Sequence, residues 1–468
     1  MKKLTKTPFD KLSTLEETTQ KICPAQDYIN DTLIYGYLES SSKQWMFMTG
    51  TYRLKRDVLF EDEARKEFKF QELRKSAPIQ GLSPEIMKKC FASKTVAQTK
   101  FLMNELREYI AQFIYLDNPR LYTLLATWIM STYHFKGFTH FPYLWLHAEK
   151  GSGKSTLLNL LSKLTFNGLL IDAASSTSAQ YRMIEMASPT LLIDEFEMMD
   201  KTIDTDLNKI LRSGFYMDGK ITKNKKQKDD FEPELISVYS PKALASISDI
   251  QDTLKERCIT IRMFKKPKSE ARRKFNPREE QMQIQYLKEK LYRYGLMHAP
   301  EIIAKYAGKS TNMVLPDHIS DREQDLWLPL VTVTFHIDLE HETTFTDELL
   351  EVIDTSSDQR KYENVLNHDA TKVIIALHRL VTTTSPDHVD GETQWYCNDT
   401  IYRFFNEKEN RELTKYMSRV TLGKKLANLN LQQETINRGK ARRYYSISSE
   451  IVQHLAERFD IPNEYLNM

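Results

Sequence analysis

The chain has 468 residues, and its 66 lysines and arginines nearly balance its 64 aspartates and glutamates. This length predicts two to four domains, and the ordinary apolar and charged fractions exclude a disordered chain or a simple repeat protein. The four cysteines never form a CxxC pair, which argues against a structural zinc site or a disulfide framework and favours a reducing cytoplasm.

Two β-rich runs within residues 25–60 predict a hairpin in a small N-terminal α+β domain, residues 1–94, whose role the pattern does not indicate. The most apolar run, residues 121–135, is shorter than the roughly 20 residues that a membrane span needs, so we expect a buried helix and no membrane association. From residue 141 short apolar runs alternate with helical stretches. This alternation predicts a parallel α/β sheet within a central domain, residues 95–362, that has a helical lead-in and a helical lid.

The segment "YLWLHAEKGSGKST" places a glycine-rich loop between an expected strand and an expected helix, as in a phosphate-binding P-loop. Ala148 replaces the usual first glycine, but Gly151 and Gly153 remain where the loop would approach the phosphates. Lys154 is expected to reach the β and γ phosphates of ATP, and Ser155 to bind Mg²⁺. The alternative is a plain glycine turn before a helix. The nucleotide-binding residues expected from this loop are Ala148, Glu149, Lys150, Gly151, Ser152, Gly153, Lys154, Ser155 and Thr156.

The segment "LLIDE" places two carboxylates after a buried strand, where open α/β sheets bind their ligands. We expect Asp194 to hold Mg²⁺ and Glu195 to orient the attacking water, the alternative being an acidic cap on the next helix. Ser246 and Ser248 follow another strand and are candidates to sense the γ phosphate, with an ordinary strand-end turn equally compatible.

Two basic features surround these motifs. Arg257 stands between a short helix and a strand, where it can serve as an arginine finger towards a neighbouring copy or as a C-terminal helix cap. Between the helix that ends near Ser213 and the strand "KALASIS", a long predicted hairpin carries at its tip lysines suited to gripping DNA phosphates, unless it is a solvated loop. These lysines are Lys220, Lys223, Lys225, Lys226 and Lys228.

The block from residue 363 to the end predicts three helices, two short strands and a final helix, a pattern typical of a winged helix. From Arg403 to Arg443 it has eleven basic residues against four acidic ones. This excess favours duplex DNA as the partner, although a winged helix can also bind protein. The expected DNA contacts are Arg419, Lys424, Lys425, Arg438, Lys440, Arg442 and Arg443.

Three segments together resemble the MCM-like AAA+ helicases and replication initiators of staphylococcal cassette chromosomes and pathogenicity islands: "TSAQYRMIEMASPTLLIDEFE", "SPKALASISDIQDTLKER" and "SDREQDLWLPL". The similarity runs from about residue 95 to the end of the chain. It implies a P-loop AAA+ (ASCE) core and a ring, expected to be a homo-hexamer, that hydrolyses ATP and moves along one DNA strand. It also implies that Arg257 is the arginine finger, Arg322 the second sensor and the lysine hairpin a pore element.

The predicted function is therefore an ATP-dependent DNA helicase that starts replication of a mobile element. Its expected partners are single-stranded and duplex DNA and a primase or polymerase. One alternative is a nucleotide-switched DNA-binding regulator without helicase activity, which Glu195 argues against because a switch needs no fast hydrolysis. Another is a protein-remodelling ATPase, which would normally present an aromatic pore residue in place of lysines.

Overall fold

The chain divides into two compact units, with the boundary between Ile353 and Asp354. The first unit therefore holds both the N-terminal segment and the central segment that the sequence separates. The computed structural model describes residues 22–39, 41–51, 56–68, 73, 83, 98–171, 177–196, 206–227, 230–308, 315–367, 369–407, 410, 417–437, 441–459 and 461–466.

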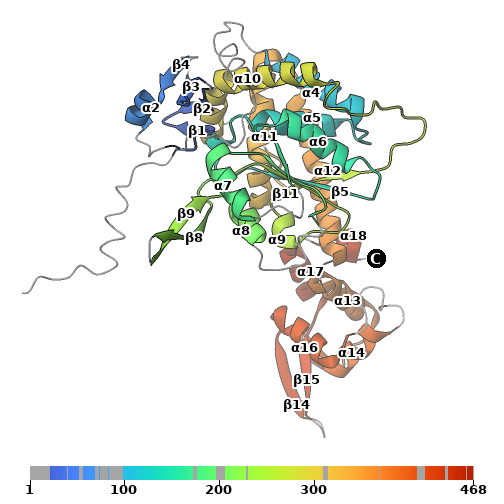
Figure 1. Ribbon diagram of the computed structural model, residues 1–468. Coiled ribbons are helices and arrows are strands. Elements are labelled where there is room, and N and C mark those ends of the chain that lie inside the picture. Colours follow the sequence, from blue (N-terminus) through green and yellow to red (C-terminus); the bar gives the residue numbers. More distant parts are fainter. Residues whose placement is uncertain are drawn as a thin grey trace, which may run out of the picture. The chain divides into compact units, whose positions relative to one another are not determined.

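A five-stranded sheet forms the centre of the first unit (Figure 1). All of its strand pairs are parallel, in the order β11-β5-β10-β7-β6, which confirms the predicted P-loop α/β fold class. Helices cover both faces of such a sheet, so its inner strands are continuous apolar runs in the sequence. Only the edge strand β6 leaves a large side chain exposed, that of Leu170. The strands are β5 (Tyr143–Ala148), β6 (Leu169–Ile171), β7 (Leu191–Ile193), β10 (Lys242–Ser246) and β11 (Cys258–Met263).

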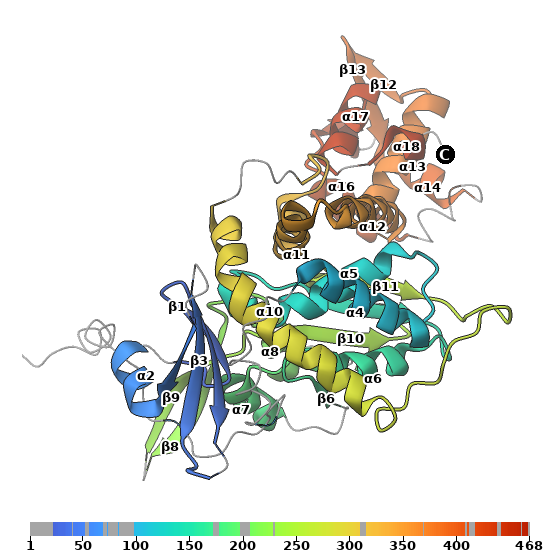
Figure 2. The same ribbon diagram turned by 90° about the horizontal axis from the view of Figure 1, so that it is seen from above.

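Helices pack around this sheet. The predicted apolar helix is α5, which is buried from Tyr122 to Ser131. Helix α6 packs on β10, β6 and β7, and the long helix α10 crosses α4, α5 and α6 (Figure 2). The helices are α4 (Thr99–Phe113), α5 (Arg120–Ser131), α6 (Lys154–Leu164), α7 (Thr177–Ala187), α8 (Asp206–Ser213), α9 (Asp252–Lys255), α10 (Gln281–Ala307), α11 (Asp321–His341) and the first part of α12 (Phe345–Asn367), which continues past the unit boundary.

An antiparallel sheet precedes α4 and shares its core with the central domain. The predicted hairpin is confirmed, because β2 and β3 pair from Leu38 opposite Trp45 to Thr32 opposite Thr51. On one face Tyr35 stacks on Phe166, and at Gly50 a β-carbon would lie 2.3 Å from the carbonyl oxygen of Leu296 in α10. This close approach requires glycine and fixes the sheet against α10. The elements are β1 (Gln26–Ile29), β2 (Thr32–Leu38), β3 (Trp45–Thr51), β4 (Arg56–Phe60) and α2 (Glu61–Phe68).

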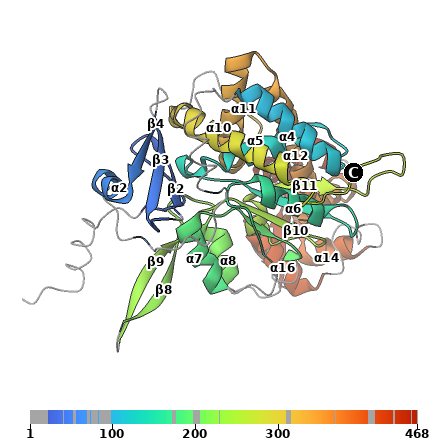
Figure 3. The same ribbon diagram turned by 45° about the horizontal axis from the view of Figure 1, so that its top comes forward.

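A two-stranded hairpin, β8 (Lys220–Gln227) and β9 (Asp230–Ser237), extends away from the rest of the first unit (Figure 3). Its base packs on α7 and α8. This hairpin is the lysine-bearing hairpin that the sequence predicts before the strand "KALASIS".

The second unit has its own core, in which helices pack on an antiparallel sheet of order β12-β13-β15-β14. Helix α16 leads into the hairpin β14–β15, whose second strand pairs with β13. Across the parts of the chain that the structure describes, no helix is both long and apolar enough to cross a bilayer. The elements of this unit are α13 (Asp369–Thr383), β12 (His388–Asp390), β13 (Thr393–Cys397), α14 (Asn398–Asn406), α16 (Arg419–Asn428), β14 (Gln433–Asn437), β15 (Ala441–Ser446), α17 (Ser449–Arg458) and α18 (Asn463–Leu466).

Candidate nucleotide site

The glycine-rich loop connects β5 to α6 at the carboxyl edge of the central sheet. Gly151 and Gly153 have φ angles of +85° and +96°, which side-chain-bearing residues rarely adopt. Ala148 is the last residue of β5 and lies opposite Met263 in β11, so it needs no left-handed backbone. This position within the strand explains why alanine can replace the first glycine.

Lys154, the first residue of α6, folds back onto the loop. Its ammonium donates hydrogen bonds to the carbonyl oxygens of Ala148 and Glu149, the latter at 3.2 Å. Gly153, the N-cap, has no side chain to bond the first N–H groups of α6. These N–H groups and the Lys154 ammonium fit the phosphates of a nucleotide, and the exposed Ser155 hydroxyl fits a magnesium ion.

Asp194 and Glu195 follow β7 at the same edge of the sheet. Asp194 is half-buried and Glu195 exposed, and an Asp194 carboxylate oxygen accepts a hydrogen bond from the Glu195 N–H at 3.0 Å. Glu195 has a φ angle of +51°, an uncommon conformation for a residue other than glycine. Such backbone conformations cluster at functional sites, where they aim a side chain in a required direction.

The two serines that are candidates for sensing the γ phosphate differ in burial and in hydrogen bonding. Ser246 is buried, and its hydroxyl accepts a hydrogen bond from Trp145 Nε1 at 2.8 Å while donating to the carbonyl oxygen of Ser248 at 2.7 Å. These bonds lie within the sheet and the turn that follows it, as in the strand-end turn that the sequence allowed equally. Ser248 is exposed after the strand, and both serines stay candidates for sensing the γ phosphate.

Two residues near the loop escaped the sequence prediction. His147 lies opposite Ser246 and Arg262 in the sheet, and burial lowers its pKa against the opposing effect of Asp249. Lys265 brings its Cε atom to 3.6 Å from where a β-carbon of Gly151 would stand. The signal for Lys265 is the basic run "KKPK" after the last strand, which places a cation beside the glycine-rich loop.

Arg257 lies at the opposite edge of the sheet. Its carbonyl oxygen accepts a hydrogen bond from the N–H of Tyr143, the first residue of β5, at 3.0 Å. The six residues of β5 separate the two edges by about 20 Å. The guanidinium of Arg257 bonds the carbonyl oxygen of Thr253 and lies 6.0 Å from the centre of the Tyr216 ring. It is therefore too far from the glycine-rich loop of its own copy to contact it.

Arg322 lies beside Arg257. It is the second residue of α11, its side chain is 70% exposed, and its guanidinium pairs with the carboxylate of Glu256. The finger and second-sensor candidates therefore share the amino edge of the sheet, away from Lys154.

The hairpin lysines are spread along β8 rather than gathered at the tip. Lys220 stands at the base, opposite Ser237, and Lys223 stands opposite Glu234 with its ammonium 5.4 Å from the centre of the Tyr181 ring. Lys225 lies opposite Glu232 and Lys226 opposite Phe231. In the register of the hairpin, acidic positions of β9 therefore stand opposite two of these lysine positions, Lys223 and Lys225. The side chains of Lys225 and Lys226, and the whole of Lys228, lie outside the described residues.

In the second unit, Arg419 begins α16, pairs with Asp399, and places its guanidinium 4.7 Å from the centre of the Tyr402 ring. Arg419, Lys424 and Arg443 line a groove of about 560 Å³ between α16 and β15. Arg442 is exposed and Lys425 half-buried, whereas Arg438 and Lys440 lie outside the described residues.

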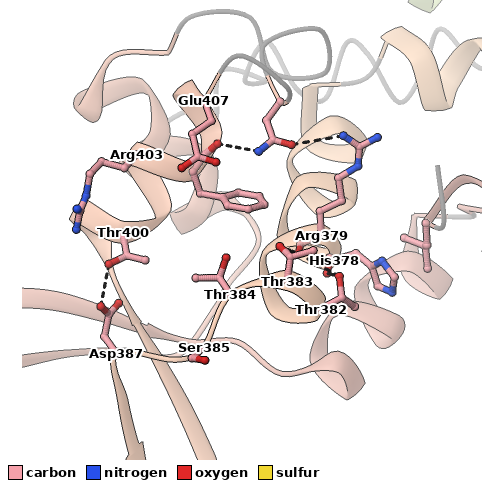
Figure 4. A pocket seen from close by; sticks show the side chains of 13 residues that line it. His378, Arg379, Thr382, Thr383, Thr384, Ser385, Asp387, Thr400, Arg403 and Glu407 are labelled. Atoms are coloured by element: carbon pink, nitrogen blue, oxygen red, sulfur yellow. Dashed lines mark hydrogen bonds between the residues drawn. The ribbon is translucent and has the colours of Figure 1, made fainter.

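A larger cavity of about 850 Å³ lies elsewhere in the second unit (Figure 4). Arg379, Arg403 and a run of hydroxyl side chains line it, and Thr400 donates to Asp387 at 2.9 Å on its wall. It contains none of the predicted site residues.

No protein-family model and no curated protein sequence matches the chain. Among solved structures, the C-terminal region of NrS-1 is similar over 89% of this chain and 96% of its own, with 12% identity and a TM-score of 0.32. An MCM homolog from Methanopyrus kandleri covers 70% of this chain and 74% of its own, with 9% identity and a TM-score of 0.34. The JCV helicase covers 58% and 70%, with 13% identity and a TM-score of 0.24.

Proposed function

We propose that the protein is an ATP-dependent DNA helicase whose hydrolysis site forms between neighbouring copies. One observation carries the proposal: Lys154 and Glu195 lie at the carboxyl edge of the sheet, and Arg257 and Arg322 lie at its amino edge, about 20 Å away. Since these arginines cannot reach their own nucleotide, they complete a site only on another copy. Repetition of this contact generates a closed ring, for which we propose a homo-hexamer.

Within that site each residue has a role. Lys154 and the N–H groups of α6 bind the phosphates, and Asp194 and Ser155 would hold Mg²⁺. The magnesium ion supplies charge neutralisation on the phosphates when it is bound. Glu195 orients the attacking water, and Arg257 and Arg322 of the next copy neutralise charge on the γ phosphate.

DNA binding is proposed for two surfaces. The lysines of β8 lie on a hairpin that extends from the ATPase unit, where they can follow the phosphates of a single strand. The second unit combines helices with the hairpin β14–β15, and we propose that it is a winged helix that binds duplex DNA through Lys424, Arg442 and Arg443.

The biological role is proposed from the motif combination in the sequence. We propose that the helicase starts replication of a mobile element and works with a primase or polymerase. An assay of strand displacement on forked DNA tests the core of the proposal. The wild-type protein should release the labelled strand with ATP, whereas Glu195→Gln should bind the fork without releasing it. Absence of displacement by an active wild-type ATPase would favour the nucleotide-switched regulator.

A further inference from the structure

Three polar side chains converge in the core between α10 and α11, remote from the residues assigned to nucleotide or DNA. His298 belongs to α10, and His336 and Glu340 lie four residues apart on one face of α11. The side chains of His298 and His336 are 7% and 1% exposed, and that of Glu340 is 32% exposed. Burying polar groups costs free energy unless they are bonded, so two buried imidazoles beside a carboxylate require a stabilising interaction.

The atoms of these side chains form a nearly equilateral triangle. His298 Nδ1 lies 3.1 Å from His336 Nε2 and 3.3 Å from Glu340 Oε1, and His336 Nε2 lies 3.4 Å from Glu340 Oε1. A zinc ion with tetrahedral bonds of about 2.0–2.1 Å holds its ligand atoms about 3.3–3.4 Å apart. The triangle thus has close to the dimensions of one face of a zinc coordination tetrahedron.

We propose that His298 Nδ1, His336 Nε2 and Glu340 Oε1 bind one Zn²⁺ that joins α10 to α11. Two imidazole nitrogens and one carboxylate oxygen are a ligand set that zinc accepts, with the fourth position left to a water molecule. The proposal does not depend on the proposed helicase activity.

A neighbouring helix holds the carboxylate in place. Thr99, the first residue of α4, donates a hydrogen bond from Oγ1 to Glu340 Oε2 at 2.9 Å, which leaves Oε1 directed at the histidines. Such outer contacts orient metal ligands and raise metal affinity. The ion therefore fixes three helices, including α11, which presents Arg322 at its other end.

Lys305 occupies the far side of His336, with Nζ 3.0 Å from Nδ1. Without metal, Nδ1 of His336 accepts this hydrogen bond, and its Nε2–H faces His298 and Glu340. Zinc on Nε2 requires the proton on Nδ1 instead, so the Lys305 ammonium has to turn away. Its long flexible stem allows this movement without unfolding the helix. Zinc binding to His336 and the hydrogen bond from Lys305 to His336 therefore exclude each other. A variant without the Lys305 ammonium is for this reason an informative control.

The first test is the metal content of the purified full-length protein, measured by mass spectrometry after growth with zinc. We expect about one zinc per chain in the wild type, and a strong loss in His298→Ala and His336→Ala. His454→Ala, which removes an exposed histidine of the second unit, should retain the zinc. Iron in place of zinc, or no metal in a folded wild-type protein, would overturn the assignment.

The second test compares affinities after the metal has been removed with a chelator. Co²⁺ titration should give the visible absorption of a tetrahedral site, and Thr99→Val should weaken binding about 10- to 100-fold. Lys305→Met should bind Co²⁺ at least as tightly as the wild type. If the histidine variants do not fold, the melting temperature and the cobalt spectrum of the wild type test the proposal. Zinc should then raise the melting temperature of the chelator-treated wild type. No rise and no cobalt spectrum would leave only a hydrogen-bonded cluster and would overturn the proposal.

Discussion

The guanidinium of Arg322 pairs with the carboxylate of Glu256, the residue immediately before Arg257. Both arginines are therefore presented together from one edge of the sheet, one by a loop and one by the first turn of α11. Neither position reaches the phosphate-binding loop of the same copy. This grouping leads to the first prediction.

Arg322→Ala should lower the ATPase kcat about 100-fold, since removal of one donor to a developing charge typically costs this much. Its stability should change by no more than about 1 kcal/mol, because the pair with Glu256 is exposed. Steady-state hydrolysis and chemical denaturation of the same preparation measure the two effects. An unchanged kcat would remove Arg322 from the site.

Gly153→Ala should weaken nucleotide binding and destabilise the first unit by about 1 kcal/mol, because alanine is strained at a φ of +96°. Calorimetric titration with a non-hydrolysable ATP analogue measures the affinity. Gly423→Ala is the matched control, since Gly423 lies in a helix with open space around its α-carbon. Equal affinities in both variants would contradict the assigned loop geometry.

His134 should make the first unit sensitive to acid. Burial, followed by the effects of His336 and His298, lowers the pKa of this side chain from 6.5 to about 3. The unfolded chain therefore binds a proton below pH 6.5 that the folded chain refuses, so stability falls as the pH falls from about 6.5 towards 3. Between pH 7 and pH 5 this one group should cost about 2 kcal/mol.

Urea denaturation of His134→Asn at both pH values checks this expectation. The variant should lose less stability on acidification than the wild type, by about the same amount. An identical pH dependence in the two proteins would show that His134 is not the responsible group.

The triple variant Lys223→Ala, Lys225→Ala, Lys226→Ala should keep its basal ATPase and lose strand displacement. Each lysine that contacts a phosphate releases counterions, so the salt dependence of single-strand binding should fall by about 2 in slope. Lys268→Ala with Lys274→Ala, two exposed lysines outside the hairpin, serves as the control. Displacement by the triple variant at the wild-type rate would exclude the hairpin as the DNA contact.

Local patterns in the sequence are sufficient to predict the glycine-rich loop between β5 and α6, the strand before Asp194 and the lysine hairpin. Each of these depends on neighbours in the chain: a glycine turn between a strand and a helix, an apolar run, or a hairpin with alternating side chains. Ala148 departs from the usual glycine pattern of such loops, but its position in the strand, opposite Met263, requires no glycine.

Features made by distant residues were not predictable from these patterns. The hydrogen bond that Ser246 accepts comes from Trp145 in the neighbouring strand, and the position of Lys223 opposite Glu234 depends on the pairing of β8 with β9. The N-terminal sheet shares its core with the central domain through Gly50 and α10, which no composition change reveals.

The spacing of the cysteines argues only against zinc sites that are built from cysteine thiolates. His298 and His336 stand 38 residues apart on different helices, and packing of those helices brings their rings together. Such a cluster leaves no mark on local periodicity, so it became visible only in the folded chain.

The most direct test of the composite site is to mix two inactive variants, Lys154→Ala and Arg257→Ala. Each alone should hydrolyse almost no ATP, because every interface lacks either the phosphate-binding lysine or the finger. In an equal mixture, random assembly should restore both groups at about one quarter of the interfaces and recover a similar fraction of wild-type hydrolysis. If the mixture stayed inactive although the two variants assembled together, or if Arg257→Ala alone remained active, a hydrolysis site shared between copies would be contradicted.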